Sequence, residues 1–236
     1  MHLAILMTNT DESDFADRHP RDGTKFSNLI HLVRPGWSLE VFRVKDSVFP
    51  DDLARFDGVM ITGSPASVQS DAPWVVRLLT LIRQIHAARL PMFGACFGHQ
   101  AIALALGGRL GPNPGGVVHG LSVNTVVSRP VWARGLPDRL KLYASHGEQV
   151  TALPDGAEVI SHALGCDVTG FFIARHVYTT QHHPEMSPDF IAALTDELAG
   201  YLGPDLTASA LESLAEPADM KVFATSIARF FEQSAG

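Results

Sequence analysis

The stretch LPMFGACFGHQAIALAL, residues 90–106, decides the fold. Its first four residues form a short apolar run of the kind that builds a buried strand, and its last six are typical of a buried helix. Between them two glycines surround one thiol, Cys96. The stretch therefore predicts a strand, a tight turn and a helix, with a cysteine at the turn.

The predicted turn has the layout of a nucleophile elbow, with cysteine in the place that serine more often holds. Gly94 and Gly98 would permit the strained backbone and the close packing that such a turn needs. A helix that begins just after Cys96 would direct N–H groups and a partial positive charge at the sulfur, which favours the thiolate. The alternative is a free cysteine that only fills space in an α/β core.

Strand-like and helix-like segments alternate on both sides of this turn. We expect strands at 3–7, 39–44 and 58–62, and helices from Phe26 to Val33 and from Trp74 to Ile85. This alternation predicts an α/β fold, a doubly wound and mostly parallel sheet flanked by helices.

The pattern changes beyond residue 117. Short strands and turns between 117 and 181 predict an antiparallel extension of the sheet, which would carry the later residues back toward Cys96. Ser187-Pro188 predicts the start of a helix, and further helices are expected across 203–236. We expect a single domain over residues 1–236.

A second motif, QHHPE at residues 181–185, adds a base and a carboxylate. Pro184 favours an extended backbone at His183. Because residues two apart in an extended chain point to the same side, His183 and Glu185 are expected to face one site and His182 to face away. Together with Cys96 they form the pattern of an activated-nucleophile triad.

A metal pair or two surface histidines are the alternatives for this motif. The other histidines lack zinc-site spacing and neither cysteine lies in a CxxC, so no metal is expected. We also expect no cofactor.

Composition limits the function classes. Apolar residues make up 46% and charged residues 18%, which is typical of a globular protein. The net charge is −7 and no basic cluster occurs, so nucleic acid is not an expected partner. No apolar run reaches the ~18 residues of a membrane span. The apolar start, Met1 to Met7, is too short for a signal peptide, and two cysteines give no disulfide framework, so we expect a cytoplasmic protein.

Four segments in order resemble the class I, triad-type glutamine amidotransferases. They are Val59–Pro65, similar to the strand and oxyanion loop of that family; Gly94–Gln100, similar to its cysteine elbow; Ser145–Val150, similar to its glutamine pocket; and Gln181–Glu185, similar to its His-Pro-Glu motif. The match spans roughly residues 55 to 200. The chain is similar to GMP synthase glutaminase domains and to free-standing members that act on γ-glutamyl peptides.

Four positions, in three segments, depart from the family pattern. Ser64 replaces the second glycine of a usual Gly-Gly-Pro, His182 stands where Phe or Tyr is common, and Gly147-Glu148 stands where Gln-Asp is frequent. These departures bear more on substrate choice than on the basic chemistry.

The resemblance implies a flavodoxin-like fold and a defined chemistry. Cys96 would attack the side-chain amide of glutamine or of a γ-glutamyl compound and form a thioester, His183 would move protons, and Glu185 would orient the imidazole. The remaining site residues that it implies are the oxyanion-hole pair Gly63 and Phe97 and the substrate-binding set Gln100, Ser145 and His146.

Several functions stay open at this point. The chain could be a self-contained amide hydrolase, a glutaminase subunit that delivers ammonia to a separate synthetase, a redox cysteine enzyme, or a catalytically idle binding protein. The intact Cys-His-Glu set argues against the last two. The segments 8–24 and 111–116 could each be a lid over the site or a solvated loop.

Overall fold

The structure, a computed structural model, describes residues 1–233; the last three residues of the expected C-terminal helical segment lie outside the described part. Its centre is a nine-stranded sheet in the order β2-β1-β3-β4-β11-β10-β9-β6-β7. The parallel half consists of β1 (His2–Met7), β2 (Ser38–Arg43), β3 (Gly58–Ile61), β4 (Met92–Ala95) and β11 (Val177–Thr180).

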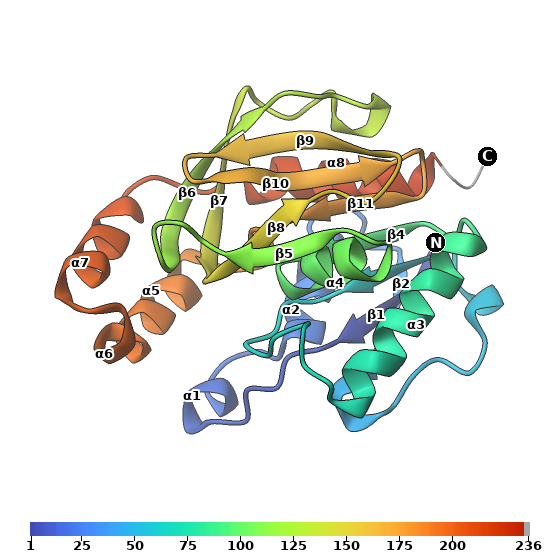
Figure 1. Cartoon of the computed structure of the whole chain (residues 1–236), viewed down its shortest axis with the longest axis horizontal. Coiled ribbons are helices and arrows are strands. Elements are labelled where there is room, and N and C mark those ends of the chain that lie inside the picture. Colours follow the sequence, from blue (N-terminus) through green and yellow to red (C-terminus); the bar gives the residue numbers. More distant parts are fainter. Residues whose placement is uncertain (234–236) are drawn as a thin grey trace.

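The other half of the sheet is antiparallel. It consists of β6 (Val118–Val126), β7 (Arg139–His146), β9 (Ala157–Ala163) and β10 (Cys166–Ile173). A small second sheet pairs β5 (Arg109–Pro112) with β8 (Glu148–Ala152) and crosses in front of the large one in Figure 1. The expected parallel sheet with an antiparallel extension is confirmed.

Helices cover both faces of the parallel half because its strands are apolar on both sides. Leu3 and Ile5 of β1 pack in one core cluster with α2 (Asp22–His31) and α8 (Met220–Glu232). Ala4 and Leu6 point to the opposite face and pack with α3 (Pro73–Ala87) and α4 (Phe97–Ala105). The two faces of a single strand thus hold the two helical layers.

Shorter helices gather at one end of the molecule, on the left of Figure 1. They are α1 (Asp14–Asp17), α5 (Pro188–Glu197), α6 (Ala199–Leu202) and α7 (Pro204–Ser213). The helix predicted at Ser187-Pro188 is confirmed, since the Ser187 hydroxyl caps α5 by accepting the N–H of Phe190 at 3.2 Å.

Two segments that were expected to be lids or solvated loops contain regular secondary structure. The polar stretch 8–24 contains α1, capped by Ser13, and buries Phe15, because one aromatic side chain is enough to anchor a short helix. Residues 109–112 form strand β5, which pairs with β8 although it contains Gly111 and ends at Pro112. The strand before Cys96 begins at Met92, later than predicted. Helix α4 begins at Phe97, directly after Cys96 as predicted.

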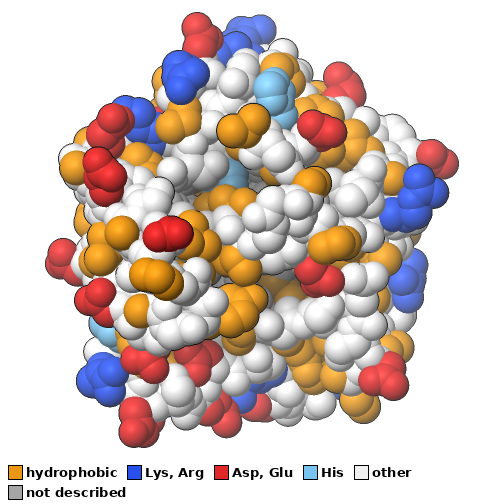
Figure 2. All heavy atoms as spheres, turned by 60° about the vertical axis from the view of Figure 1, so that its left-hand side comes forward, with side chains coloured by type: hydrophobic (Ala, Val, Ile, Leu, Met, Phe, Trp, Pro, Cys, Tyr) orange, Lys and Arg blue, Asp and Glu red, His pale blue; other side chains and the backbone are white. Residues whose placement is uncertain are grey.

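Charged side chains of both signs are interspersed around the rim of the face in Figure 2, and its centre is mainly uncharged. Among residues 1–233, no helix combines the length and the apolar character that crossing a membrane requires.

Candidate active site

Cys96 occupies a strained turn between β4 and α4. Its φ of 50° and ψ of −106° lie where non-glycine residues are rarely found. The backbone N–H of Cys96 donates to Thr180 O of β11 at 2.9 Å, and its carbonyl accepts the N–H of Gln100 at 3.0 Å. The turn is therefore held from both sides, by the neighbouring strand and by the first turn of the helix.

The two glycines of the elbow are required by close packing. A Cβ at Gly98 would lie 2.4 Å from the carbonyl oxygen of Ile61, and one at Gly94 would lie 2.6 Å from the carbonyl carbon of Gly98. Both distances are shorter than a carbon side chain tolerates, so the helix reaches the sheet only with glycine at these positions.

His183 and Glu185 lie together in the loop after β11. His183 Nδ1 and Glu185 Oε1 are 2.7 Å apart, and the two side chains are 6% and 1% exposed. The imidazole lies close to Cys96, since both side chains border Gly63. The backbone N–H of His183 donates to Tyr143 O at 2.8 Å, so strand β7 of the antiparallel half holds the base in place. The structure thus assembles Cys96, His183 and Glu185 as the sequence predicted.

Neighbouring charges decide the protonation of His183. Burial on its own would lower its pKa, but the negative charges of Glu185 and Cys96 raise the pKa well above the ordinary value. The adjacent His182 shows the opposite behaviour, because burial and the nearby His146 and His183 lower its pKa well below 6.5. Of the two adjacent imidazoles, only that of His183 lies in surroundings that favour a proton.

Gly63, after β3, lies against His183 and Cys96. A Cβ at this position would be 2.9 Å from His183 Cε1 and 3.7 Å from Cys96 Cβ. The Thr8 hydroxyl, at the end of β1, donates to Gly63 O at 2.9 Å and fixes the loop. Phe97 is the first residue of α4, so its N–H has no acceptor within the helix. Both predicted oxyanion residues therefore border the triad.

A cavity of about 230 Å³ opens beside Cys96. It is lined by Ser64, Pro65, Ala66, Ser67, Cys96, Phe97, Gln100, Ser145, His146, Gly147 and Glu148. The predicted substrate-binding residues Gln100, Ser145 and His146 all lie on its wall. Gln100 Nε2 donates to Glu148 O at 2.9 Å and to Gln181 Oε1 at 3.1 Å, which ties the elbow helix to the β7–β8 turn.

Glu148 belongs to the segment expected to line the pocket, but the hydrogen bonds of its carboxylate were not predicted. It accepts hydrogen bonds from Ser67 Oγ at 3.2 Å and from Gln69 Nε2 at 3.0 Å. This links the β7–β8 turn to the segment after the oxyanion loop. Thr8 was missed as well, although its place directly after a predicted strand put it at the edge of the sheet where ligands bind.

The ring of His182 lies beside that of His146, with the two centroids 5.5 Å apart. Both histidines of the 181–185 motif are buried, so the alternative of two surface histidines is wrong. Within residues 1–233, no group of three or more His, Cys, Asp or Glu side chains is arranged to hold a metal ion.

Comparisons with known proteins show which family the chain resembles. Residues 23–191 match the family model described as glutamine amidotransferase class-I. Gamma-glutamyl peptidase 3 of Arabidopsis thaliana is 32% identical to this chain, and the aligned part covers 69% of each of the two chains. A GMP synthase (glutamine-hydrolyzing) of Thermomicrobium roseum is 35% identical over 55% of this chain and 23% of its own length. A glutamine amidotransferase structure from Thermotoga maritima superposes with a TM-score of 0.78 at 17% identity, covering 98% of this chain and 96% of that one.

Proposed function

Because the chain belongs to the class I glutamine amidotransferase family, we propose that it hydrolyses the side-chain amide of glutamine or of a γ-glutamyl compound through a thioester on Cys96. The observation that carries this proposal is the triad. The thiol stands at the N-terminus of α4, close to an imidazole whose Nδ1 lies 2.7 Å from a buried carboxylate oxygen.

The thiolate of Cys96 attacks the amide carbonyl and forms a tetrahedral intermediate. Its oxyanion would be stabilised by preorganised N–H donors, for which Phe97 and Gly63 are the candidates. The protonated His183 gives its proton to the departing amine, and the C–N bond breaks to leave the thioester. His183 then takes a proton from water, and the hydroxide releases glutamate and the thiolate.

The raised pKa of His183 fits this cycle, because the first step needs an imidazolium close to the leaving amine. Glu185 would stabilise the imidazolium and fix which ring nitrogen faces the substrate. The cavity between Ser64 and Glu148 would hold the amino-acid end of the substrate, next to Gln100. Two free cysteines suit a reducing compartment such as the cytoplasm.

A partner-dependent glutaminase subunit is the second candidate. The GMP synthase relative is matched over only 23% of its length, so the similar part of that protein is joined to a much larger remainder. If this chain works with a separate synthetase, the ammonia would pass to that partner. We favour the self-contained hydrolase, because the gamma-glutamyl peptidase relative matches over a larger share of both chains.

The test is to assay the purified chain on free glutamine and on a panel of γ-glutamyl peptides and amines, with Cys96→Ala as the control. Turnover of any substrate by the wild-type chain, lost in Cys96→Ala, supports the hydrolase. Activity that depends on an added synthetase favours the subunit. Turnover that survives in Cys96→Ala contradicts both.

A further inference from the structure

His119 of β6 lies behind the wall of the cavity beside Cys96. It is directly opposite Ser145 of β7 in the antiparallel ladder, so the two side chains lie on the same face of the sheet. Ser145 lines the cavity beside Cys96, whereas His119 lines a different cavity, between β6 and the β9–β10 turn. A substrate held beside Cys96 would therefore meet Ser145 directly and His119 only through Ser145.

Both ring nitrogens of His119 have hydrogen-bond partners. Nδ1 lies 3.1 Å from Ser145 Oγ, and Nε2 lies 2.9 Å from Thr195 Oγ1 of α5. The Thr195 side chain is buried, and its hydroxyl donates to Ile191 O, one turn earlier in α5, at 2.7 Å. These three hydrogen bonds form one chain, which runs from the backbone of α5 to the wall of the cavity.

The α5 end fixes the direction of this chain. Thr195 has a single hydroxyl proton, which Ile191 O accepts, so its oxygen can only accept from His119. His119 Nε2 therefore carries a proton and donates it. A neutral imidazole has only one N–H, which leaves Nδ1 as an acceptor, so the Ser145 hydroxyl must donate to it.

His119 is neutral at neutral pH. Burial, and second the nearby charge of His183, lower the pKa of His119 to about 4. Its Nδ1 consequently stays free of a proton and keeps accepting from Ser145. The Ser145 hydroxyl thus turns its proton toward His119 and keeps its oxygen lone pairs for a donor inside the cavity.

An acceptor on this wall matches one group of the expected substrate. The amino-acid end of a glutamyl group carries an ammonium, which only donates hydrogen bonds. Glu148 adds a carboxylate to the same wall, where it is engaged by Ser67 and Gln69. A negative charge and an acceptor hydroxyl on one wall favour a cationic group over an anionic one.

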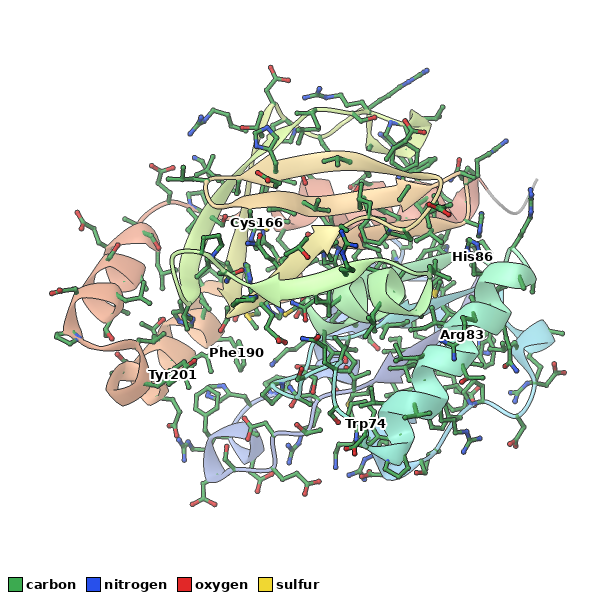
Figure 3. The ribbon with its side chains drawn as sticks, viewed as in Figure 1. Trp74, Arg83, His86, Cys166, Phe190 and Tyr201 are labelled. Carbon is green, nitrogen blue, oxygen red and sulfur yellow. The ribbon has the colours of Figure 1, made fainter. Side chains whose placement is uncertain are left out.

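A purely structural role is the alternative, since His119 also joins β6 to α5. Helix α5 has other anchors, however. Ile191 is fully buried in one core cluster with Tyr143. Figure 3 shows Phe190 between α5 and α1, where its ring centroid lies 5.8 Å from that of Phe15. The position of α5 therefore does not depend on His119 alone.

We propose that His119 is a positioning residue for substrate binding: it holds the Ser145 hydroxyl as an acceptor toward the cavity, where Ser145 binds the α-ammonium of the glutamyl group. This role rests on the amide hydrolysis proposed above. Losing the His119–Ser145 hydrogen bond should weaken substrate binding and leave the chemistry at Cys96 largely intact, because both ring nitrogens of His119 are engaged elsewhere.

The experiment uses two variants that each keep one half of the imidazole. The side-chain oxygen of His119→Asn can take the place of Nδ1 and accept from Ser145. The longer amide of His119→Gln reaches the place of Nε2, so it keeps only the hydrogen bond to Thr195. Kinetics on glutamine gives kcat and KM, and calorimetry on the same variants carrying Cys96→Ala gives the Kd of glutamine without turnover.

His119→Gln should raise KM and Kd by about fivefold, the size of one ordinary hydrogen bond, and keep kcat within about twofold. His119→Asn should recover most of this loss. Ser145→Ala should weaken binding by a similar factor, and combining it with His119→Gln should add little, because both changes remove the same hydrogen bond. For 4-carbamoylbutyrate, which is glutamine without its α-amino group, His119→Gln should leave the Kd unchanged.

Circular dichroism checks that each variant folds. If His119→Gln does not fold, Ser145→Ala leaves the link to α5 in place and tests the acceptor through the same Kd. An unchanged Kd, equal losses in His119→Asn and His119→Gln, or an equal loss with 4-carbamoylbutyrate would overturn the positioning role while glutamine hydrolysis stands. A wild-type chain that turns over neither glutamine nor a γ-glutamyl peptide would overturn the proposed hydrolysis, and the calorimetric comparison then decides the role of His119 separately. No binding of glutamine at all would overturn both.

Discussion

The end of β4 and the start of β10 each carry one buried cysteine, but the two environments are different. Cys96 is 6% exposed and Cys166 is 2% exposed, so burial does not distinguish them. Cys96 lies at the N-terminus of a helix and close to His183, whereas burial raises the pKa of Cys166 to about 11. From this difference we expect Cys96, with its helix end and its imidazole neighbour, to be the reactive thiol, and Cys166, which is only buried, to be inert.

The largest expected effect comes from removing each sulfur in turn. Cys96→Ala should lower turnover of a γ-glutamyl substrate by at least about a thousandfold, since the nucleophile is lost. Cys166→Ala should keep turnover within about twofold and lower the free energy of unfolding by about 1 kcal/mol, because it only leaves a small gap in the core. Steady-state kinetics and denaturant unfolding measure both. If Cys96→Ala and Cys166→Ala lost turnover to a similar extent, the two cysteines would not differ in function as we expect.

The next effect sharpens the same contrast at two neighbouring histidines. His183→Ala should lower turnover nearly as much as Cys96→Ala, because nothing else can protonate the leaving amine. His182→Ala should keep turnover within about tenfold, since its ring packs beside His146, and it is His183 that contacts Glu185. Both variants need the same substrate and a check of folding by circular dichroism. A dead His182→Ala that remains folded would show that the base is misassigned.

A smaller effect is expected at the carboxylate behind the base. Glu185→Gln keeps a hydrogen-bond partner 2.7 Å from His183 Nδ1 but removes the charge that raises the pKa of His183. We expect Glu185→Gln to retain at least about tenfold more turnover than His183→Ala. Kinetics across pH provide the readout: the limb that reports His183 should move to lower pH. An unchanged profile would mean that the charge of Glu185 does not control the base.

The smallest effect concerns the reactivity of the thiols. Below pH 11 the Cys166 thiol should stay protonated, because burial raises its pKa to about 11, and it should react with an alkylating agent only near that pH or after unfolding. Cys96 should be modified first at neutral pH. Peptide mapping after brief alkylation identifies the site. Equal labelling of the two cysteines at neutral pH would contradict the comparison.

Local patterns were enough to predict the centre of the fold and the triad. The elbow and the His-Pro-Glu motif each specify their own backbone, so local spacing placed Cys96 at a turn and His183 on the same side as Glu185. That the two motifs meet was inferred from the triad pattern. The strands of the parallel half are apolar on both faces, and the helices between them have regular apolar faces. Periodicity and turn chemistry therefore located them within a few residues.

The walls of the site could not be predicted, because they depend on contacts between distant segments. Ser67 and Gln69 reach Glu148 across about eighty residues of sequence, and the Thr8–Gly63 hydrogen bond spans 55. Helix α1 has one buried aromatic residue, Phe15, among polar neighbours, which gives no helical period. Its burial follows from packing against Phe190 of α5, a contact that only the folded chain creates.

The central claim is that Cys96 attacks the γ-carbonyl of a glutamyl group held in the adjacent pocket. The most direct measurement uses a glutamine analogue with a diazoketone in place of its side-chain amide, followed by intact-mass spectrometry and peptide mapping. We predict one adduct per chain, on the peptide that contains Cys96, with labelling slowed by excess glutamine or γ-glutamyl peptide. An adduct on Cys166, or no adduct from a chain that still hydrolyses γ-glutamyl substrates, would contradict the account.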